Sequence, residues 1–327
     1  MIRRSVLLLL VFVACRGEQP VQQAAAVPLP RTKLVVNEAL RTIVYLPVYH
    51  AKQTGCFSRA GLDVDIVTGG TATNAFAALL SKEADIAIAD PMYVPISREK
   101  GTQTRVIGQL VGRIAVWGVT KDPNVTELSA ATLRGKTIAT HPRPMTAYIY
   151  TMRAIRDAGL TERDVQVLQV TPGSEIVPLL NGQANYALTL EPNVSRATTQ
   201  GAHVVLSYPQ LLGDQIFTGI MTRDDYLRDH RAAAVAFVRC VQQELTTIRA
   251  TPDAALPTAA QYFPQLPQAV LRDAIRRIVG ENVMPASILV SNESWNKAIA
   301  ARVTSGDLKR ATTLQENADI AVMQAAR

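Results

Sequence analysis

The segment LLSKEADIAIADP, residues 79–91, recurs about a hundred residues later as LLNGQANYALTLEP, residues 179–192. A short glycine turn precedes each copy, VTGGT at 67–71 and VTPGS at 170–174. Order and spacing are kept while residue identity is loose, a pattern typical of two structurally equivalent lobes rather than of a solenoid of short repeats. Two such lobes facing each other predict a cleft between them.

The composition is that of a globular protein with room for two domains. The chain has 327 residues, and 48% of them are hydrophobic, which is enough to bury two moderate cores. The formal charge is +7, and the lysines and arginines are scattered rather than gathered in runs with aromatic residues. This pattern argues against nucleic acid as a partner.

The first residues predict an export signal followed by a lipid anchor. Arg3 and Arg4 precede an apolar run, 6–14, that is too short to span a bilayer. Residues 12–14 before Cys15 resemble a lipoprotein cleavage box, although Phe12 stands where leucine is usual. We therefore expect a signal peptide at 1–14, lipidation at Cys15 and a flexible tether at 15–32. The expected location is the periplasm, with the protein anchored to the membrane.

Two cysteines remain after the leader, Cys56 and Cys240. An exported protein with two cysteines can form one disulfide. Cys56 lies at the end of an expected helix and Cys240 on the apolar face of another, so the pattern favours two buried thiols and leaves a disulfide open.

Strands and helices alternate in each copy. We expect a strand at 34–37, a helix at 46–57, a strand at 62–67 and a further strand at 86–89. A helix between the last two strands has Thr73 or Asn74 as its expected cap. The alternation predicts an α/β fold with a parallel-type sheet in each lobe.

The lobes are expected to be joined by two crossover segments. Residues 106–120 look like one apolar strand, and a crossover is placed near Val119. Strand-like segments at 204–207 and 216–221 then return the chain to the first lobe, followed by a long helix from Tyr226 to Ala250. Lobe 1 is thus expected to be discontinuous, at 33–119 and 215–327, with lobe 2 at 120–214.

The ordered set of motifs resembles the periplasmic solute-binding proteins of ABC importers, in the group that handles nitrate, sulfonates, taurine, bicarbonate and thiamine-precursor pyrimidines. The residues that carry the resemblance are Tyr49 to Lys52 with Gly55 and Phe57, Ala60 to Val64, Gly69-Gly70, Leu80 to Ala89, Leu133 to Ile138, Gly182 to Asn185, Glu191-Pro192 with Ser195-Arg196, Thr222 to Leu227 and Trp295. The resemblance covers about Lys33 to Asp307. No single motif is decisive, but their order is specific.

This resemblance implies a type II periplasmic-binding fold whose two lobes close on a small organic ligand, anionic or heteroaromatic, and deliver it to an ABC permease in the inner membrane. It implies no cofactor and no enzymatic step. Pyrimidine binders often carry an Asn-His pair where this chain has Val44-Tyr45, which counts against a thiamine-precursor ligand.

Candidate ligand-binding residues follow from the strand pattern, because ligands of open α/β sheets lie beyond the carboxyl ends of the strands, next to helix N-termini. Gly70 and Thr71 could cradle an oxyanion, or form a plain turn. Asp90 and Glu191, equivalent in the repeat, could accept ligand hydrogen bonds or cap the next helix. The complete set is Arg41, Tyr45, Gly70, Thr71, Asp90, Tyr93, Arg143, Thr146, Ser174 and Glu191.

Within that set, Arg143 could offer a forked donor to an anion or be an exposed loop arginine. Tyr45 and Tyr93 could stack on a planar ligand or pack in the core.

Catalytic and metal motifs are not found. The four histidines show no metal-ligand spacing with each other or with cysteine, and no GxSxG, HExxH or P-loop sequence occurs. Two alternatives stay open. One is an enzyme on the same fold that acts on a pyrimidine or menaquinone precursor, and the other is a ligand-sensing module of a membrane receptor.

Overall fold

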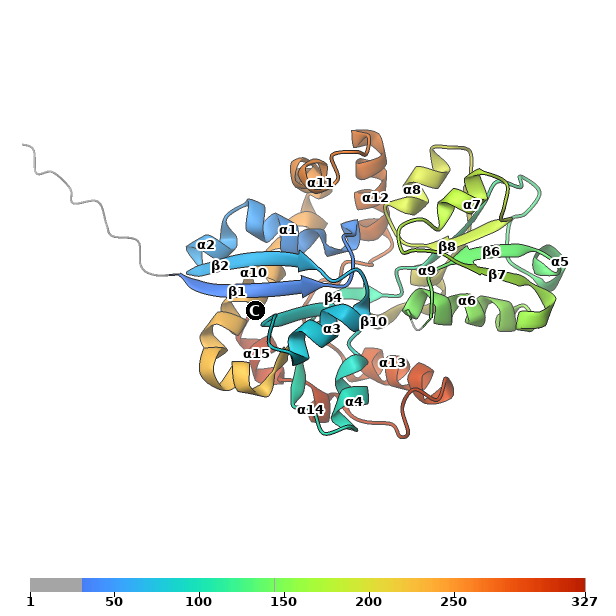
Figure 1. Cartoon of the computed structure of the whole chain (residues 1–327). Coiled ribbons are helices and arrows are strands. Elements are labelled where there is room, and N and C mark those ends of the chain that lie inside the picture. The colour runs from blue at the N-terminus through green and yellow to red at the C-terminus, as the bar shows by residue number, and fades with distance from the viewer. Residues whose placement is uncertain (1–30, 144, 327) are drawn as a thin grey trace, which may run out of the picture. The chain divides into compact units, whose positions relative to one another are not determined.

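The computed structural model describes residues 31–143 and 145–326. The expected signal peptide, Cys15 and most of the expected tether lie outside these residues. Two five-stranded sheets, each flanked by helices, make up the part described (Figure 1). Both sheets belong to one compact unit, which begins at Arg31.

The first sheet has the strand order β2-β1-β3-β10-β4, and β10 runs antiparallel to both neighbours. Its strands are β1 (Thr32–Glu38), β2 (Leu62–Thr68), β3 (Ile86–Ala89), β4 (Thr104–Arg113) and β10 (Asp214–Arg223). The helical segments between them are η1 (Ile43–Tyr45), α1 (Leu46–Gln53), α2 (Cys56–Arg59), α3 (Ala72–Leu80) and α4 (Tyr93–Arg98).

The second sheet repeats this plan with the order β7-β6-β8-β5-β9, and β5 is its antiparallel strand. Its strands are β5 (Trp117–Thr120), β6 (Thr137–Thr140), β7 (Gln166–Gln169), β8 (Tyr186–Thr189) and β9 (His203–Ser207). Its helical segments are α5 (Ala130–Leu133), α6 (Thr146–Asp157), η2 (Glu162–Asp164), α7 (Ile176–Leu180), α8 (Asn193–Thr198) and α9 (Tyr208–Leu212). In Figure 1, α7 and α8 lie on one side of this sheet and α6 on the other.

The C-terminal third of the chain is helical and packs around the first sheet. It comprises α10 (Asp224–Ala250), η3 (Pro252–Ala255), α11 (Leu256–Tyr262), α12 (Gln268–Gly280), α13 (Asn292–Thr304), α14 (Leu314–Asn317) and α15 (Ile320–Ala325). Helix α12 also contacts α8 of the second sheet. None of the helices in the described part combines the length and the apolar character needed to cross a bilayer.

The repeat seen in the sequence is a repeat of structure. In each half, a central strand, β1 or β6, pairs in parallel with two neighbours, and the antiparallel fourth strand comes from a crossover. The α/β fold with two sheets is therefore confirmed. The sequence predicted residues 117–119 as the end of lobe 1. In the structure, β5 pairs with β8 and β9 of the second sheet. The lobe boundaries themselves stay a prediction.

Three local expectations were wrong. The helix expected at 46–57 breaks between α1 and α2, because Gly55 has a φ of 76° that continues no right-handed helix. The strand expected at 106–120 is two strands in different sheets. The cap of α3 is Thr71, whose hydroxyl accepts the N–H of Asn74, rather than Thr73 or Asn74.

The preference for free thiols was also wrong, because Cys56 and Cys240 form a disulfide with a Cα–Cα distance of 5.8 Å. The bond joins α2 to α10. Both cysteines are buried beside the stacked rings of Phe57 and Phe237, whose centroids are 5.0 Å apart. Apolar surroundings suit a buried disulfide as well as they suit buried free thiols.

Candidate functional site

The carboxyl ends of β1, β2 and β3 meet at one edge of the first sheet. The strand register places Glu38, the last residue of β1, beside Thr68 of β2 and Ile88 of β3. In the second sheet, the equivalent register places Thr140, at the end of β6, beside Gln169 of β7. The predicted residues lie on the loops and in the first helical turns that follow the strand ends, as expected for ligand sites of open α/β sheets.

Asp90 connects the two sheets. It follows β3, and its carboxylate accepts hydrogen bonds from the hydroxyl of Thr146, at the start of α6, and from the guanidinium of Arg302 on α13. Arg302 also donates to Thr146 Oγ1 at 3.2 Å and to Asp307 at 2.9 Å. The side chains of Asp90 and Arg302 are only 9% and 8% exposed. A residue of the second sheet's half thus contacts a buried ion pair of the first.

Tyr93 lies in the first turn of α4, directly after this cluster. Its hydroxyl is 2.7 Å from Thr73 Oγ1 on α3. Phe76 stacks on its ring with centroids 5.4 Å apart, and the ring is half-buried. Burial raises the pKa of Tyr93, so the hydroxyl is neutral at physiological pH.

Gly70 and Thr71 form the turn into α3. Gly70 has a φ of 81°, a conformation that favours glycine. Gly69 is required for a different reason, since a Cβ there would lie 2.7 Å from Asn37 Oδ1 and 2.9 Å from the backbone nitrogen of Ala75. Asn37 is 9% exposed, and its Oδ1 has no hydrogen-bond partner among the described residues. A buried amide oxygen without a hydrogen-bond partner, beside the start of a helix, is a candidate ligand contact.

Arg41 lies over the rings of Tyr49 and Tyr262, at 5.3 and 5.2 Å from their centroids. Its Nε donates to Glu38 at 2.6 Å. The Glu38 side chain is fully buried and also accepts the hydroxyls of Tyr49 and Thr68. Burial raises the pKa of Glu38, although hydrogen bonds from Tyr49 and Arg41 oppose the shift. Arg41 is therefore held by a carboxylate and two rings.

Glu191 follows β8 and occupies the position equivalent to Asp90. Its carboxylate accepts the backbone N–H and hydroxyl of Ser195, at 3.0 and 2.8 Å, and Nε of Arg277 on α12, at 2.8 Å. Its carbonyl accepts the hydroxyl of Thr42, 2.8 Å away in the other half of the molecule. The side chain is fully buried, so Glu191 holds α8 and α12 together.

Ser174 lies beside Gly173, before α7, and its backbone N–H donates to Thr171. The neighbouring Glu175, buried and not predicted, organises this loop. It accepts the backbone N–H of Gly173 at 2.6 Å and the side chain of Asn193 at 2.8 Å, and pairs with His141 at 2.8 Å. Burial alone would raise the pKa of Glu175, but His141 and the other hydrogen bonds outweigh it and lower the pKa.

Arg143 is not part of the cluster around Asp90, whereas Tyr45 is near enough for the charges of Glu38 and Asp90 to help burial raise its pKa. Tyr45 is buried in η1, and burial raises its pKa well above the usual range. Arg143 is exposed, pairs with Glu162 at 3.1 Å and lies 4.7 Å from the ring centroid of Tyr148. The structure brings together Asp90, Tyr93 and Thr146 in one cluster and places Glu191 in a second.

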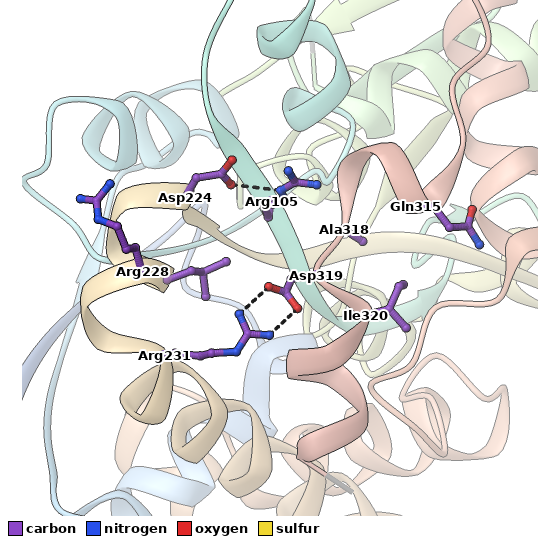
Figure 2. A pocket seen from close by; sticks show the side chains of 9 residues that line it. Arg105, Asp224, Arg228, Arg231, Gln315, Ala318, Asp319 and Ile320 are labelled. Atoms are coloured by element: carbon purple, nitrogen blue, oxygen red, sulfur yellow. Dashed lines mark hydrogen bonds and ion pairs between the residues drawn. The ribbon is translucent and has the colours of Figure 1, made fainter.

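A separate cavity of about 630 Å³ lies among α10, α14, α15 and β4 (Figure 2). There Arg105 pairs with Asp224 at 3.1 Å, and Arg231 makes two hydrogen bonds to Asp319. Arg105 is near the start of β4, which runs parallel to β3 because both are antiparallel to β10. The cavity is therefore at the opposite sheet edge from Asp90, and it contains none of the predicted residues.

Sequence reasoning missed five of the residues described above. Asn37 and Glu38 end a strand that was predicted, so the strand-end rule could have found them. Glu175 directly follows the predicted Ser174. Arg277 and Arg302 lie in C-terminal helices far along the chain, and nothing in the local pattern distinguishes them from other helix arginines. No group of three or more His, Cys, Asp or Glu in the described range has an arrangement suited to a metal ion.

The duplicated sheets and the exchanged antiparallel strands are those of the two-sheet fold that periplasmic binding proteins share. Within that class, residues 42–255 match the model of the "NMT1/THI5 like" family, and the chain belongs to this family. The protein YtlA of Bacillus subtilis (strain 168) is 23% identical over 316 residues, which cover 94% of this chain and 90% of YtlA.

Solved structures of similar fold include the periplasmic nitrate-binding protein NrtA from Synechocystis PCC 6803. Its TM-score is 0.71 at 16% identity, with 90% of this chain and 88% of NrtA covered. The periplasmic aliphatic sulphonate binding protein SsuA from Escherichia coli has a TM-score of 0.69 at 15% identity, with 88% and 97% covered. The expected resemblance to the nitrate and sulfonate group of periplasmic binding proteins is confirmed.

Proposed function

We propose that this protein is the extracytoplasmic solute-binding component of an ABC importer, which captures a small organic molecule and delivers it to a permease. The observation that carries the proposal is the contact of Thr146, in the half built on the second sheet, with Asp90 at a strand end of the first. Such a contact brings the proposed ligand-binding strand ends of the two halves together. A ligand that touches both halves stabilises the closed state and shifts the population toward it.

The proposed ligand contacts are Asn37, Gly70, Thr71, Thr73, Tyr93 and Thr146. Asn37 supports this assignment because its buried amide oxygen has no partner among the described residues, and burying an unpaired acceptor is unfavourable unless a ligand or water donates to it. The start of α3 lies beside Asn37, since a Cβ on Gly69 would contact both Asn37 Oδ1 and the backbone nitrogen of Ala75. Asp90 and Glu191 are assigned to holding the two halves rather than to direct contact.

The proposed role needs binding and release but no bond-breaking step. Asp90 is paired with Arg302, and Glu191 with Arg277, so neither carboxylate is free to act as a general base. We therefore propose binding without turnover. Mass spectrometry of a ligand recovered after prolonged incubation with the protein would reveal a chemical change if the protein were an enzyme.

A binding experiment tests the proposal directly. Native mass spectrometry of the mature protein, purified without refolding, should show a retained small molecule of constant mass, and isothermal titration with the same molecule should then give saturable binding. Asn37→Ala should weaken binding, whereas Asp229→Asn, at an exposed pair with Arg228, should not. A folded protein that binds no member of a panel of sulfonates, carboxylates, pyrimidines and vitamins would contradict the proposal.

We also propose that Cys15 is lipidated and anchors the protein to a membrane, with the folded part outside the cytoplasm. The support is the sequence alone, since Cys15 follows an apolar run typical of a signal peptide. Metabolic labelling with an alkyne fatty acid should mark the wild-type protein and leave Cys15→Ser unlabelled. Labelling of both proteins, or of neither, would contradict the anchor.

A further inference from the structure

Two short segments connect the halves of the molecule. Residues 114–116 lead from β4 of the first sheet to β5 of the second, and residues 208–213 lead from β9 back to β10. The segments lie side by side, since the backbone N–H of Tyr208 donates to the carbonyl of Val116 at 3.2 Å. Because the chain passes between the sheets only here, a rotation of one half against the other has to bend both segments.

Glu281, the C-cap residue of α12, contacts the second sheet next to both segments. Its carboxylate accepts Nε1 of Trp117, the first residue of β5, at 2.9 Å, and the hydroxyl of Ser207, the last residue of β9. Trp117 and Ser207 face each other in the strand register. One carboxylate therefore binds both strands at the points where they join the crossover segments.

The turn after α12 is fixed to the first half through its backbone. The carbonyl of Glu281 accepts Nη1 of Arg113, the last residue of β4, at 3.2 Å, and this nitrogen also donates to the carbonyl of Pro209 at 3.3 Å. The carbonyl of Val283 accepts the backbone N–H of Gly112 at 3.0 Å. The backbone of this turn is thus bonded to β4, whereas the Glu281 side chain is bonded to the second sheet.

Arg277 gives α12 another polar contact with the second half. It lies one turn before Glu281, donates to Glu191 after β8 at 2.8 Å and is 3.8 Å from the Glu281 carboxylate. The side chains of Arg277 and Glu281 are 24% and 12% exposed. Partly exposed polar contacts can be exchanged for contacts with water, which suits contacts between halves that separate and meet again.

Trp117 gives the contact a preferred geometry. Its side chain is fully buried, and the indole N–H is the only hydrogen-bonding group that it has. If Glu281 moved away, that buried N–H would lose its acceptor, which is unfavourable. The contact therefore favours the arrangement in which the end of α12 touches β4, β5 and β9 together.

We propose that Glu281 is a positioning residue. Its contacts with Trp117 and Ser207 form a latch that holds the two halves in the arrangement described above. The inference rests on the proposed binding function, because a ligand that touches both halves binds the arrangement in which they meet. Loss of the latch populates other arrangements, and the apparent affinity falls with the fraction of protein that remains competent to bind.

Distances between the halves test the latch without a ligand. Glu83 and Gln183 are exposed, occupy equivalent positions in the two copies and precede β3 and β8. Nitroxide labels on a Glu83→Cys, Gln183→Cys, Cys15→Ser protein report the separation of the halves by double electron–electron resonance, since the two remaining cysteines form the disulfide. The measurement uses protein that native mass spectrometry shows to carry no small molecule.

Glu281→Ala removes both side-chain bonds of the latch. The ratio of other arrangements to the wild-type arrangement should rise about tenfold or more, because hydrogen bonds to a charged group are lost. Glu281→Gln keeps an acceptor and should give a smaller rise. Glu293→Ala removes an exposed carboxylate that pairs with Lys297, and this matched control should keep the wild-type distances.

Ser207→Ala tests the latch from the other side and replaces Glu281→Ala if that variant does not fold. It should shift the distances in the same direction as Glu281→Ala. A protein with both changes should shift them no further than Glu281→Ala alone, because Ser207 acts through the Glu281 carboxylate.

The outcomes are distinct. Wild-type distances in every folded variant at Glu281 and Ser207 overturn the latch. An equal shift in Glu293→Ala, or a sum of independent shifts in the double variant, overturns it as well. A wild type that binds no member of the panel of small molecules contradicts the proposed function instead, and the distance result then still stands because no ligand enters that measurement.

Discussion

Arg302 on α13 donates to the carboxylate of Asp90 at the end of β3, and Thr146 at the start of α6 donates to the same carboxylate. Asp90 has an equivalent in the second half, Glu191, which binds Arg277 of α12 and, through its carbonyl, Thr42. Both arginines come from the helical C-terminal segment. That segment therefore carries the counter-ions for the repeat-related acids of both sheets.

Removal of Arg302 should destabilise the fold strongly. Arg302→Gln leaves Asp90 buried without its counter-ion, and breaking one side of a buried pair costs about 3 kcal/mol. Urea unfolding followed by circular dichroism measures the loss. Arg231→Gln removes a more exposed pair with Asp319 and should cost less than about 1 kcal/mol. Similar losses of unfolding free energy in both variants would show that the buried Asp90–Arg302 pair contributes no more to stability than the exposed Arg231–Asp319 pair.

The hydroxyl of Thr146 should hold the start of α6 to the first half of the molecule. Thr146→Val removes this hydrogen bond and should lower the unfolding free energy by about 1 kcal/mol. Hydrogen exchange of the amides at 146–152 should become faster in the ligand-free protein. Thr146→Ser keeps the hydroxyl and serves as the matched control. Equal exchange in all three proteins would exclude a holding role for Thr146.

The disulfide between Cys56 and Cys240 should contribute much of the stability of the first half. It links residues 184 apart in the sequence, and closing so long a loop restricts the unfolded chain by roughly 3–5 kcal/mol. Urea unfolding with and without reductant measures this contribution. A Cys56→Ala, Cys240→Ala variant should match the reduced protein and ignore the reductant. No effect of reductant on the oxidised protein would contradict the prediction.

Glu191 and Asp225 should give opposite pH dependences of stability. Burial raises the pKa of Glu191, against opposing hydrogen bonds from Ser195 and Arg277. The stability that this carboxyl contributes is therefore fully present below its ordinary pKa of 4.5 and is lost as the pH rises through the higher folded value. Relative to Glu191→Gln, the wild type should lose stability as the pH rises above 4.5.

Asp225 serves as the control of opposite sign. A hydrogen bond from Lys82, with help from Arg223, lowers its pKa to about 2. Its contribution is present above the ordinary value of 3.8 and lost as the pH falls through about 2. Unfolding free energies of Glu191→Gln, Asp225→Asn and the wild type across this range check both signs. Parallel pH dependences of the unfolding free energy in the two variants would contradict the opposite signs expected for Glu191 and Asp225.

Most of the fold was predictable because it depends on local patterns. The alternation of strands and helices in the two copies, and the turns at Gly70 and Gly173, follow from periodicity and from glycine conformations. The errors came where one local sequence pattern fits two different structures. The apolar run at 106–120 reads as one strand, but its two halves pair in different sheets, and strand length alone does not indicate where a chain changes partners.

The candidate site was predictable only in part. The strand-end rule selected Asp90, Tyr93 and Thr146, which the structure brings together, because strand carboxyl ends in such sheets share one edge. It also selected Arg143, which pairs with Glu162 and lies on the ring of Tyr148 outside that cluster, and its role as a ligand contact stays a prediction. It also missed Asn37, although that residue ends a predicted strand, because only the packed structure shows that its amide lacks a partner.

By itself, the sequence determined the doubled α/β plan and the equivalence of Asp90 with Glu191, since both depend on hydrophobic periodicity and on spacing along the chain. Tertiary structure alone decided that Arg302, 212 residues from Asp90, and Arg277, 86 residues from Glu191, neutralise these acids. The physical reason is that a buried carboxylate binds whichever cation packing delivers to it, and the packing of α12 and α13 leaves no mark in the local pattern around either acid.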